Sequence, residues 1–228
     1  IKYAANAFLV TKLSFVNSIA AVCESVGANV DAVMEGLGHD RRIGSGYLRP
    51  GPGWGGSCFP KDTRSLLQMA GQAGYDFRFL DVAVEVNDEQ FDRVANKVRK
   101  AAGGQLNNQR IAVWGLTFKA GTDDLRDSPS IAIIDRLLEG GATVCAYDPM
   151  VSEICPPLDA AVKLASSPLD ACNDAHVLVV LTEWDDYKNV NPAEVAKRLN
   201  RLAVVDARNL LDRFSWESDG FEYLGIGR

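Results

Sequence analysis

Residues 111–114 read Ile-Ala-Val-Trp and form the first of several short apolar runs in the second half of the chain. The runs are 111–114, 143–147, 176–181 and 203–205. Segments with helical character separate them, at 129–139, within 159–172 and at 192–200. Alternating strand-like and helix-like segments are typical of a parallel sheet covered by helices on both faces. We therefore expect residues 105–228 to form an α/β domain.

The first half of the chain, residues 1–104, has helical patterns only. Residues 81–102 contain no Gly or Pro, carry Val84, Phe91, Val94 and Val98 at core spacing, and stop at a Gly-Gly pair. At 1.5 Å per residue this helix would span about 30 Å, enough to link two domains. Further helices are expected at 3–23, at 31–37 and from Pro60 to about 73, with a long glycine-rich loop at 41–57.

Composition excludes several classes of protein. The chain has 228 residues, 47% of them hydrophobic, with 24 basic and 30 acidic side chains and a net charge of −6. Wholesale disorder is excluded, and nucleic acid or an anionic membrane is a poor partner, although a few basic residues can still bind phosphate. The stretch 3–23 is too polar for a membrane span and lacks signal-peptide features.

The five cysteines are odd in number and form no CxxC or Cys/His cluster. We expect neither a disulfide framework nor a metal site, and a reduced, cytoplasmic setting fits best. The chain also opens on Ile1, inside a helical pattern with no capping signal before it. We expect it to be a piece of a longer protein.

The most informative stretch for chemistry is Gly53-Trp-Gly-Gly-Ser-Cys-Phe-Pro-Lys-Asp62. Its glycines allow a ligand to approach the backbone closely. Cys58 precedes the expected Pro60 helix, where free N–H groups and the helix dipole favour a thiolate, and Lys61 acts in the same direction. Asp62 lies one turn further on and could order a water or relay a proton. The alternative is a buried structural cysteine at a glycine-rich turn.

A second pair of residues lies near the N-terminus. Lys2 and Asn6 are four residues apart and share one helix face, so both could donate to an oxyanion or a sugar hydroxyl. The alternative is two ordinary solvated side chains. The segment 51–56 is not a dinucleotide fingerprint, because no strand precedes it and its glycine spacing differs.

Together these motifs resemble the UDP-glucose/GDP-mannose dehydrogenase family. The matching residues are Lys2 to Asn6, Arg42-Ile-Gly44, Gly53 to Asp62 and Phe118-Lys119. The resemblance implies a helical dimerisation domain followed by a Rossmann-like, three-layer domain that binds the UDP-sugar. Family members begin with an NAD-binding domain that carries GxGxxG, and this chain has no such segment.

The resemblance also implies a reaction. The family oxidises the C6 alcohol of a nucleotide sugar to a carboxylate in two hydride transfers to NAD, through a cysteine thiohemiacetal and a thioester. Cys58 would be the nucleophile, Lys2 and Asn6 would stabilise the oxyanion and order the water, and Asp62 would assist proton transfer. The expected product from UDP-glucose is UDP-glucuronate, and the chain alone would be inactive.

By the same resemblance, a further set of residues would contact the substrate, with Arg42 acting across a homodimer. This set is Arg42, Tyr47, Arg49, Gly51, Gly53, Trp54, Gly55, Phe118, Lys119 and Arg208. Lys61 and Arg126 would lie on the NAD side. Considered without the family, each arginine would be read as a surface charge.

Three alternatives remain open. The chain could be a non-catalytic module for dimerisation and nucleotide-sugar binding, with the 81–102 helix as its interface. It could also be part of a dehydrogenase for another nucleotide sugar such as GDP-mannose. By the same resemblance, Ser57-Cys58-Phe59 favours UDP-glucose over UDP-N-acetylmannosamine, since the relatives that act on the latter tend to have His before the cysteine. A Cys-dependent hydrolase would need His39 or His176 beside Cys58. The dehydrogenase reading predicts that Lys2 and Asn6 lie within one side-chain length of the Cys58 sulfur, and that Lys119 faces the same cleft.

Overall fold

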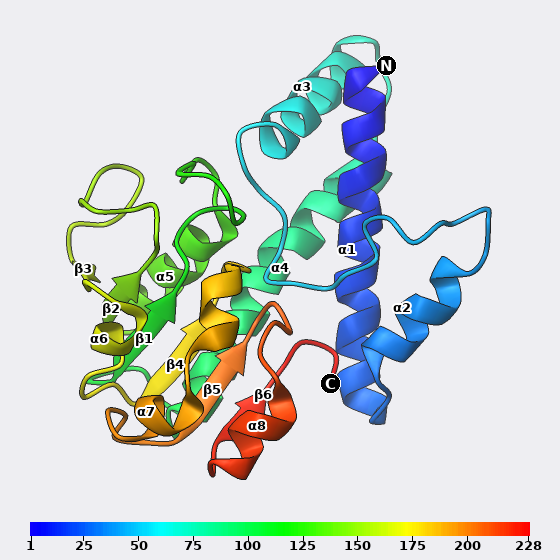
Figure 1. Ribbon diagram of the computed structural model, residues 1–228. Coiled ribbons are helices and arrows are strands. Elements are labelled where there is room, and N and C mark those ends of the chain that lie inside the picture. Colours follow the sequence, from blue (N-terminus) through cyan, green and yellow to red (C-terminus); the bar gives the residue numbers. More distant parts are fainter. The chain divides into compact units, whose positions relative to one another are not determined.

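The computed structural model describes residues 1–228 and divides them into two compact units (Figure 1). The helical unit comprises residues 1–91 and 226–228, and the α/β unit comprises residues 92–225. The sequence places the domain boundary at 104, after the long helix. The compact units instead divide within that helix, α4 (Arg78–Ala101), and the last three residues return to the helical unit.

The helical unit contains α1 (Lys2–Val26), α2 (Val30–Gly38), α3 (Phe59–Gln72) and the first part of α4. Helix α1 ends at Gly27, whose left-handed conformation lets its N–H bond the carbonyl of Cys23. Helix α2 begins at Asn29, whose side chain accepts from the next turn, and it runs through Gly36 to Gly38. Pro60 occupies the second position of α3, after Phe59. Helices are therefore found wherever the sequence predicts them.

Helix α4 buries a different stripe from the expected one. Val94 and Val98 are fully buried as expected, but Val84 and Phe91 are only half-buried. The buried stripe instead includes the polar side chains of Asn87 and Gln90. A pattern based on apolar residues alone passes over such positions, because a buried amide is indistinguishable in sequence from an exposed one.

By length and composition α1 is the one helix that could cross a membrane, so the sequence argument that it is too polar was too strict. Its polar residues have partners inside the helical unit. Ser14 donates to the carbonyl of Ala83 at 2.7 Å, and the side-chain oxygen of Asn17 accepts the N–H of Gly51 at 2.9 Å. Both side chains are buried, as expected for the central helix of a folded unit.

The α/β unit is built on a six-stranded, wholly parallel sheet with the order β3-β2-β1-β4-β5-β6. Its strands are β1 (Arg110–Trp114), β2 (Thr143–Tyr147), β3 (Lys163–Leu164), β4 (Val177–Val180), β5 (Ala203–Asp206) and β6 (Glu222–Leu224). The four expected strands form its centre. The two short edge strands, β3 and β6, were not expected.

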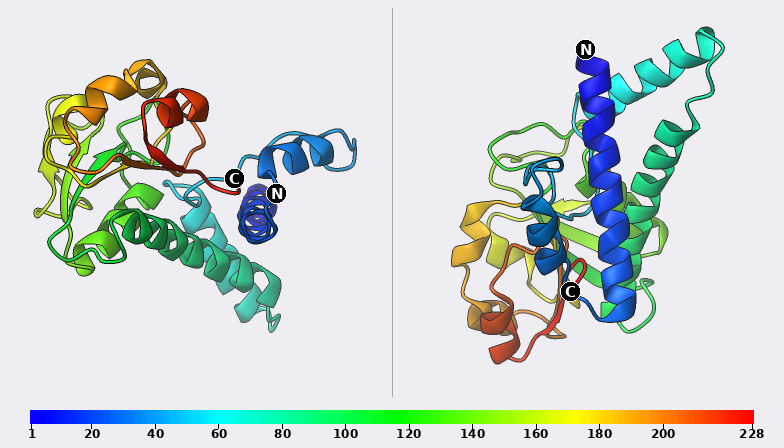
Figure 2. Two further views of the ribbon diagram at one scale, coloured as in Figure 1. Left: turned by 90° about the horizontal axis from the view of Figure 1, so that it is seen from below. Right: turned by 90° about the vertical axis from the view of Figure 1, so that its right-hand side faces the viewer.

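Helices cover both faces of this sheet, as the sequence predicts. In Figures 1 and 2, α5 (Pro129–Glu139) and the end of α4 lie on one face. The other face carries α6 (Pro168–Ala171), α7 (Pro192–Ala196) and α8 (Arg213–Ser218). A short 3-10 turn, η1 (Asp185–Asn189), follows β4. The helices expected within 159–172 and at 192–200 are therefore shorter than predicted.

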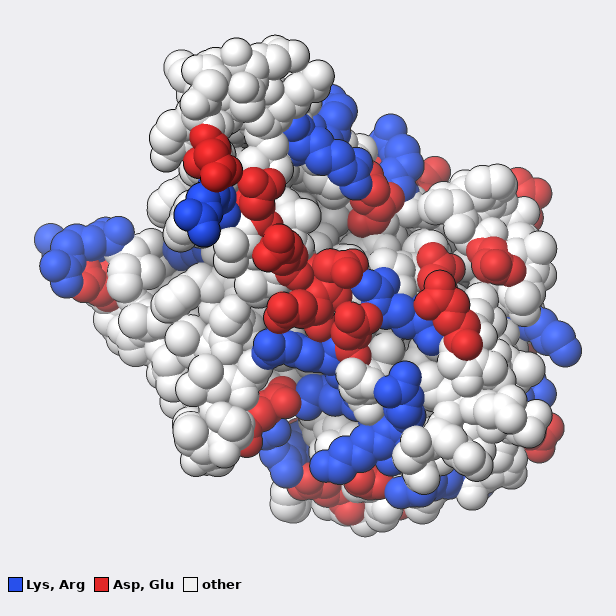
Figure 3. Space-filling view, turned by 180° about the vertical axis from the view of Figure 1, so that it is seen from behind, with Lys and Arg blue, Asp and Glu red and all other residues white.

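The strands are apolar on both sides because both faces are covered. Alternate residues such as Ala112, Trp114 and Leu178 join the aromatic cluster that includes Tyr187 and Trp216. Their neighbours along the strands, among them Ile111 and Val177, are equally buried on the opposite side. On the face of the molecule in Figure 3, basic and acidic side chains lie in neighbouring groups.

Candidate active site

Cys58 is exposed and occupies the position just before α3, where its side chain makes no capping hydrogen bond. Cys155 is also exposed, whereas Cys23, Cys145 and Cys172 are buried, and all five are free thiols. The reading of Cys58 as a buried structural cysteine is therefore wrong. Its backbone carbonyl accepts the N–H of Asp62 at 2.9 Å, which places Asp62 one helical turn away as expected.

Asp62 joins α3 to the start of α1. Asn6 donates to its Oδ2 at 2.6 Å, and the ammonium of Lys2 lies 3.1 Å from the same oxygen. The carboxylate is completely buried, while the Lys2 side chain is largely exposed. The two donors predicted to share a helix face therefore converge on the predicted acid, and α1 and α3 pack against each other.

Burial raises the pKa of Asp62. The hydrogen bonds from Lys2 and Asn6, together with the charges of Lys2 and Lys61, lower this pKa by more than burial raises it. The net pKa of Asp62 is therefore below the ordinary value. The same hydrogen bond and charge raise the pKa of Lys2, with a smaller contribution from Cys58. The pair is therefore an ionised carboxylate and an ammonium at neutral pH. The predicted approach of Lys2 and Asn6 to the Cys58 sulfur itself stays a prediction.

One oxygen of Asp62 remains without a hydrogen bond. Its Oδ1 is buried and has no such partner, and the ammonium of Lys61 lies 4.0 Å from it. The neighbouring hydroxyl of Thr63 is also buried and without a partner. Buried polar groups are normally hydrogen bonded, so the unpaired Oδ1, one helical turn from Cys58, is left as an acceptor for a proton or a water hydrogen bond.

A clamp of buried side chains fixes the glycine-rich loop that leads to Cys58. Asn87 binds both backbone groups of Trp54: its Oδ1 accepts the N–H at 2.8 Å, and its Nδ2 donates to the carbonyl at 3.0 Å. Gly51 is held in the same way, by Asn17 at its N–H and by Gln90 at its carbonyl. The indole of Trp54 donates to Ser14. We call Ser14, Asn17, Asn87 and Gln90 the loop clamp.

The expected substrate contacts in the loop fall into two groups: residues whose backbone groups the loop clamp already binds, and residues whose backbone N–H groups stay unpaired. The ring of Trp54 is part of the apolar core, and the backbone groups of Gly51 and Trp54 are bound within the unit. Gly53 and Gly55 keep unpaired backbone N–H groups. Gly53 has a φ of 126°, and a Cβ there would lie 2.4 Å from the Phe91 ring, so only glycine fits.

The remaining predicted residues of the helical unit are exposed. Tyr47 adopts a positive φ of 60° and its ring lies 6.4 Å from that of Phe59, next to Cys58. Arg49 lines a pocket of about 690 Å³ beside α2. Arg42 is almost fully exposed, and its guanidinium is bound by Asp40 alone. Arg42 thus makes no hydrogen bond or ion pair with Lys2, Asn6, Cys58 or Asp62 of its own chain.

A second group of predicted residues lies at the carboxyl ends of strands in the α/β unit. The strand order reverses between β1 and β4, which is where ligands bind in open α/β sheets. Gly115 permits the two strand ends to approach, since a Cβ there would meet Thr182 at 2.4 Å. Arg208 bridges them by donating to Leu181 and Phe118. Lys119 is exposed, with its ammonium 5.3 Å from the Phe118 ring.

The same unit does not form a dinucleotide site of the kind found in NAD domains. Such a site uses a free carboxylate after the second strand to bind a ribose. The corresponding residue, Asp148, is buried and accepts from the N–H groups of Leu116 and Thr117 and from Trp184. Arg126, predicted on the NAD side, is paired with Asp124 at 2.8 Å. The unit therefore lacks the free ribose-binding carboxylate of an NAD domain, and the expected contacts of Lys61 and Arg126 with NAD stay predictions.

Neither histidine supports a Cys-His pair. The Nδ1 of His176 accepts the N–H of Arg110 at the start of β1, and His39 caps the end of α2. The sequence reasoning also missed residues. Two of them, Ser14 and Asn17 of the loop clamp, interrupt the apolar stripe of α1, and this interruption could have identified them. Glu183 lies 2.9 Å from Arg208, but nothing in the sequence around it points to that pairing.

The chain thus combines an exposed thiol beside a bound carboxylate with an α/β unit of the nucleotide-binding type. It belongs to the UDP-glucose/GDP-mannose dehydrogenase family: the central domain of that family matches residues 1–89, and its UDP binding domain matches residues 112–213. The family is one of oxidoreductases.

The chain is similar to "UDP-glucose 6-dehydrogenase" of Rhizobium meliloti (strain 1021), with 43% identity over all of this chain and 52% of the relative. It is 41% identical to "UDP-glucose 6-dehydrogenase TuaD" of Bacillus subtilis (strain 168), covering 50% of it. A solved UDP-glucose dehydrogenase from Pyrobaculum islandicum matches 99% of this chain and half of its own, at 30% identity and a TM-score of 0.85. The chain therefore spans about half the length of the curated relatives it matches.

Proposed function

We propose that this chain provides the nucleophile and the UDP-sugar site of an NAD-dependent UDP-glucose 6-dehydrogenase. The observation that carries the proposal is the exposed Cys58 at the start of α3, one turn from a buried Asp62 that Lys2 and Asn6 hold. The names of the relatives suggest UDP-glucose as the substrate. UDP-glucuronate is then the product.

The residues of this chain suit the covalent part of the reaction. The Cys58 thiolate would add to the carbonyl carbon of a C6 aldehyde, forming a C–S bond and placing negative charge on the oxygen. Lys2 has further N–H groups beyond the one bound to Asp62, and Asn6 has a second amide hydrogen, so both can stabilise that oxyanion. The hydride transfers belong to NAD, whose main site we place outside this chain.

Hydrolysis of the resulting thioester needs a base for water. The unpaired Oδ1 of Asp62 is the acceptor available for that role, and the carboxylate is ionised at neutral pH. A water bound there would lose a proton to Oδ1 while its oxygen attacks the thioester carbon. The C–S bond then breaks and the thiolate leaves, which restores Cys58 and releases the carboxylate product.

The decisive experiment measures NADH formation from UDP-glucose by the full-length protein. Cys58→Ser should abolish it, while Cys155→Ser, at the other exposed cysteine, should leave it unchanged. Equal activity of Cys58→Ser and wild type would refute the proposed nucleophile. The 228-residue chain alone should form no NADH, and activity there would show that no further domain is needed.

We propose that Lys119 and Arg208 bind the ribose and diphosphate of the nucleotide. Both are cations at the carboxyl ends of the strands, beside the point where strand order reverses. GDP-mannose remains the alternative substrate. Calorimetric titration with UDP and with GDP separates the two, and stronger binding of GDP would favour the alternative.

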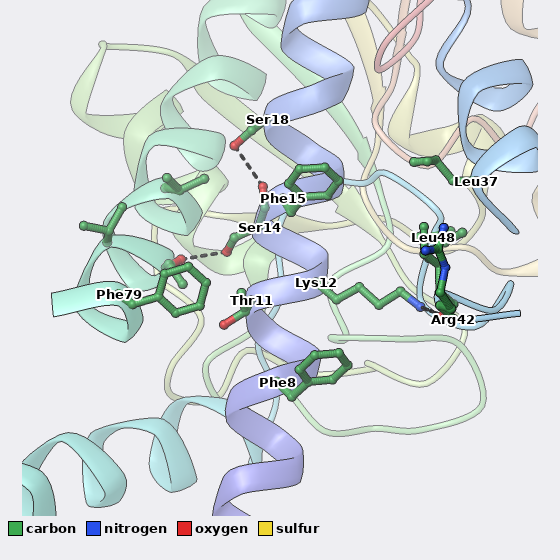
Figure 4. A pocket seen from close by; sticks show the side chains of 14 residues that line it. Phe8, Thr11, Lys12, Ser14, Phe15, Ser18, Leu37, Arg42, Leu48 and Phe79 are labelled. Atoms are coloured by element: carbon green, nitrogen blue, oxygen red, sulfur yellow. Dashed lines mark hydrogen bonds between the residues drawn. The ribbon is translucent and has the colours of Figure 1, made fainter. Parts of the chain in front are cut away.

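We further propose a homodimer formed through an apolar groove on the helical unit (Figure 4). The groove has a volume of about 490 Å³ and is lined by α1, α4 and the 37–48 segment, with Lys12 and Arg42 at its edge. Phe8, Phe15 and Phe79 are more than half exposed there. Such a surface is typical of an interface, and a partner seated on it would meet the outward-facing Arg42. The reduced cysteines fit a cytoplasmic location.

A further inference from the structure

The guanidinium of Arg208 is fixed in place before any ligand binds. Its Nε donates to the carbonyl of Leu181 at 2.8 Å, and its Nη2 donates to the carbonyl of Phe118 at 3.3 Å. The side chain is only 16% exposed. Its Nη1 has no partner and keeps two N–H groups for a ligand. The two backbone carbonyls therefore suffice to orient the group.

Glu183 contributes a negative charge next to Arg208 but does not orient its guanidinium. Its Oε2 lies 2.9 Å from Nε, but that N–H is directed at Leu181, so Oε2 is buried without a hydrogen bond. Burial lowers the pKa of Arg208, and the charges of Glu183 and Asp206 raise it again. Glu183 thus compensates a buried cation that is already held by other groups.

The other carboxylate near Arg208 is fully engaged. Asp206 is buried and accepts hydrogen bonds from the N–H groups of Arg208, Leu210 and Leu211 and from the Tyr223 hydroxyl. Its charge is dispersed over these four donors. Glu183 is 40% exposed, lies directly after Thr182 beyond the end of β4, and has no hydrogen bond to its Oε2. It is therefore the carboxylate that an incoming anion would meet.

We propose that Glu183 is an internal counter-anion for Arg208, which weakens the binding of a diphosphate-bearing nucleotide and so speeds its release. The inference rests on the proposed function, since it takes Arg208 as a nucleotide contact. A bound phosphate and Glu183 would share one guanidinium, and two like charges at this distance repel each other. Glu183 would then turn outward when the nucleotide binds and return when it leaves.

The test compares UDP binding to the full-length protein and its variants by calorimetry and stopped-flow. Glu183→Gln keeps the size of the side chain and removes its charge, so it should lower the Kd roughly three- to tenfold, mainly by slowing dissociation. The matched control is Glu222→Gln. It removes a carboxylate from Arg201 at the amino ends of β5 and β6, whereas Arg208 lies at the carboxyl ends, and it should leave the Kd unchanged.

The outcome separates this inference from the proposed function. Tighter binding cannot come from damage to the fold, so an unchanged or higher Kd for Glu183→Gln overturns the inference. Arg208→Met should raise the Kd, and the effect of Glu183→Gln should vanish in that background. If Arg208→Met leaves the Kd unchanged, or the wild type does not bind UDP, the proposed nucleotide contact fails and the inference fails with it.

Discussion

At the scale of single residues, Asp62 is a carboxylate that is both fully buried and ionised. Burial alone favours the protonated acid, and the charges and hydrogen bonds of Lys2 and Asn6 reverse that preference. Since the folded pKa lies below the unfolded one, the ionised group contributes stability above the unfolded pKa. That stability is lost as the pH falls through the folded pKa.

Because the pKa of Asp62 is lower in the folded than in the unfolded protein, the effect of Asp62→Asn on stability should depend on pH. The variant should unfold at a lower urea concentration than the wild type at pH 7, and the difference should narrow as the pH falls below the unfolded pKa of about 4. Urea titrations across this range provide the measurement. Asp40→Asn is the control, because it removes the half-buried carboxylate of an ion pair whose other member, Arg42, is exposed to solvent, and it should have little effect. A constant difference at all pH values would contradict the assignment.

A second prediction concerns thiol reactivity. Cys155 is the fair reference for Cys58, because the other three cysteines are buried and would react slowly whatever their chemistry. Cys58 lies at a helix N-terminus, so iodoacetamide should label it several-fold faster than Cys155. Mass spectrometry of peptides sampled over time gives both rates in one experiment. Equal rates would speak against an activated nucleophile.

Local spacing in the sequence predicted the pairs Cys58–Asp62 and Lys2–Asn6 correctly. It could not show that the two pairs meet, because residues 6 and 62 are joined only by the packing of α1 on α3. The counter-ion of Arg208 was hidden for the same reason. Glu183 and Arg208 follow different strands, and only the sheet order brings those strands together.

At the scale of elements, the loop clamp explains how a glycine-rich segment can hold one shape. Glycine increases the freedom of the unfolded chain, so an ordered loop with several glycines needs specific anchors. The anchors come from α1 and α4, and each places a buried side chain against the backbone of residues 51–54. The approach to Cys58 is therefore set by helix packing.

Asn87→Ala tests the loop clamp. It would leave the N–H and carbonyl of Trp54 buried without partners, which should lower the free energy of unfolding by about 2–4 kcal/mol. Asn96→Ala is the matched control on the same helix, because Asn96 is exposed and bonded only to Arg99. This substitution should change the free energy of unfolding by no more than about 0.5 kcal/mol. Urea denaturation measures both. Similar free energies of unfolding for the two variants would show that the loop clamp does not anchor the loop.

The sequence predicted the long elements far better than the short ones. Strands β3 and β6 contain two and three residues, too few for an apolar run to be recognised, and they pair only because the sheet edge is already formed. The 159–172 segment has an apolar pattern, yet only four of its residues are helical, because β3 and its flanking turns occupy the rest.

At the scale of the whole molecule, the exposed aromatic residues of the groove predict self-association. Phe8→Glu would place a charge in the proposed interface and should convert a dimer to a monomer at micromolar concentration, as measured by light scattering. Phe214→Glu is the control, because Phe214 is at least as exposed as Phe8 but lies in the α/β unit, outside the groove. A wild-type monomer, or a dimer that survives Phe8→Glu, would contradict the groove as the interface.

The return of residues 226–228 to the helical unit makes the α/β unit a closed insertion. The N–H of Gly227 bonds Glu24, its carbonyl accepts the N–H of Val30, and Arg228 pairs with Asp31. The α/β unit is thus tethered twice, once through α4 and once through this segment. A protease that nicks the chain within α4 would leave the two pieces held together by the contacts of residues 226–228 under native conditions.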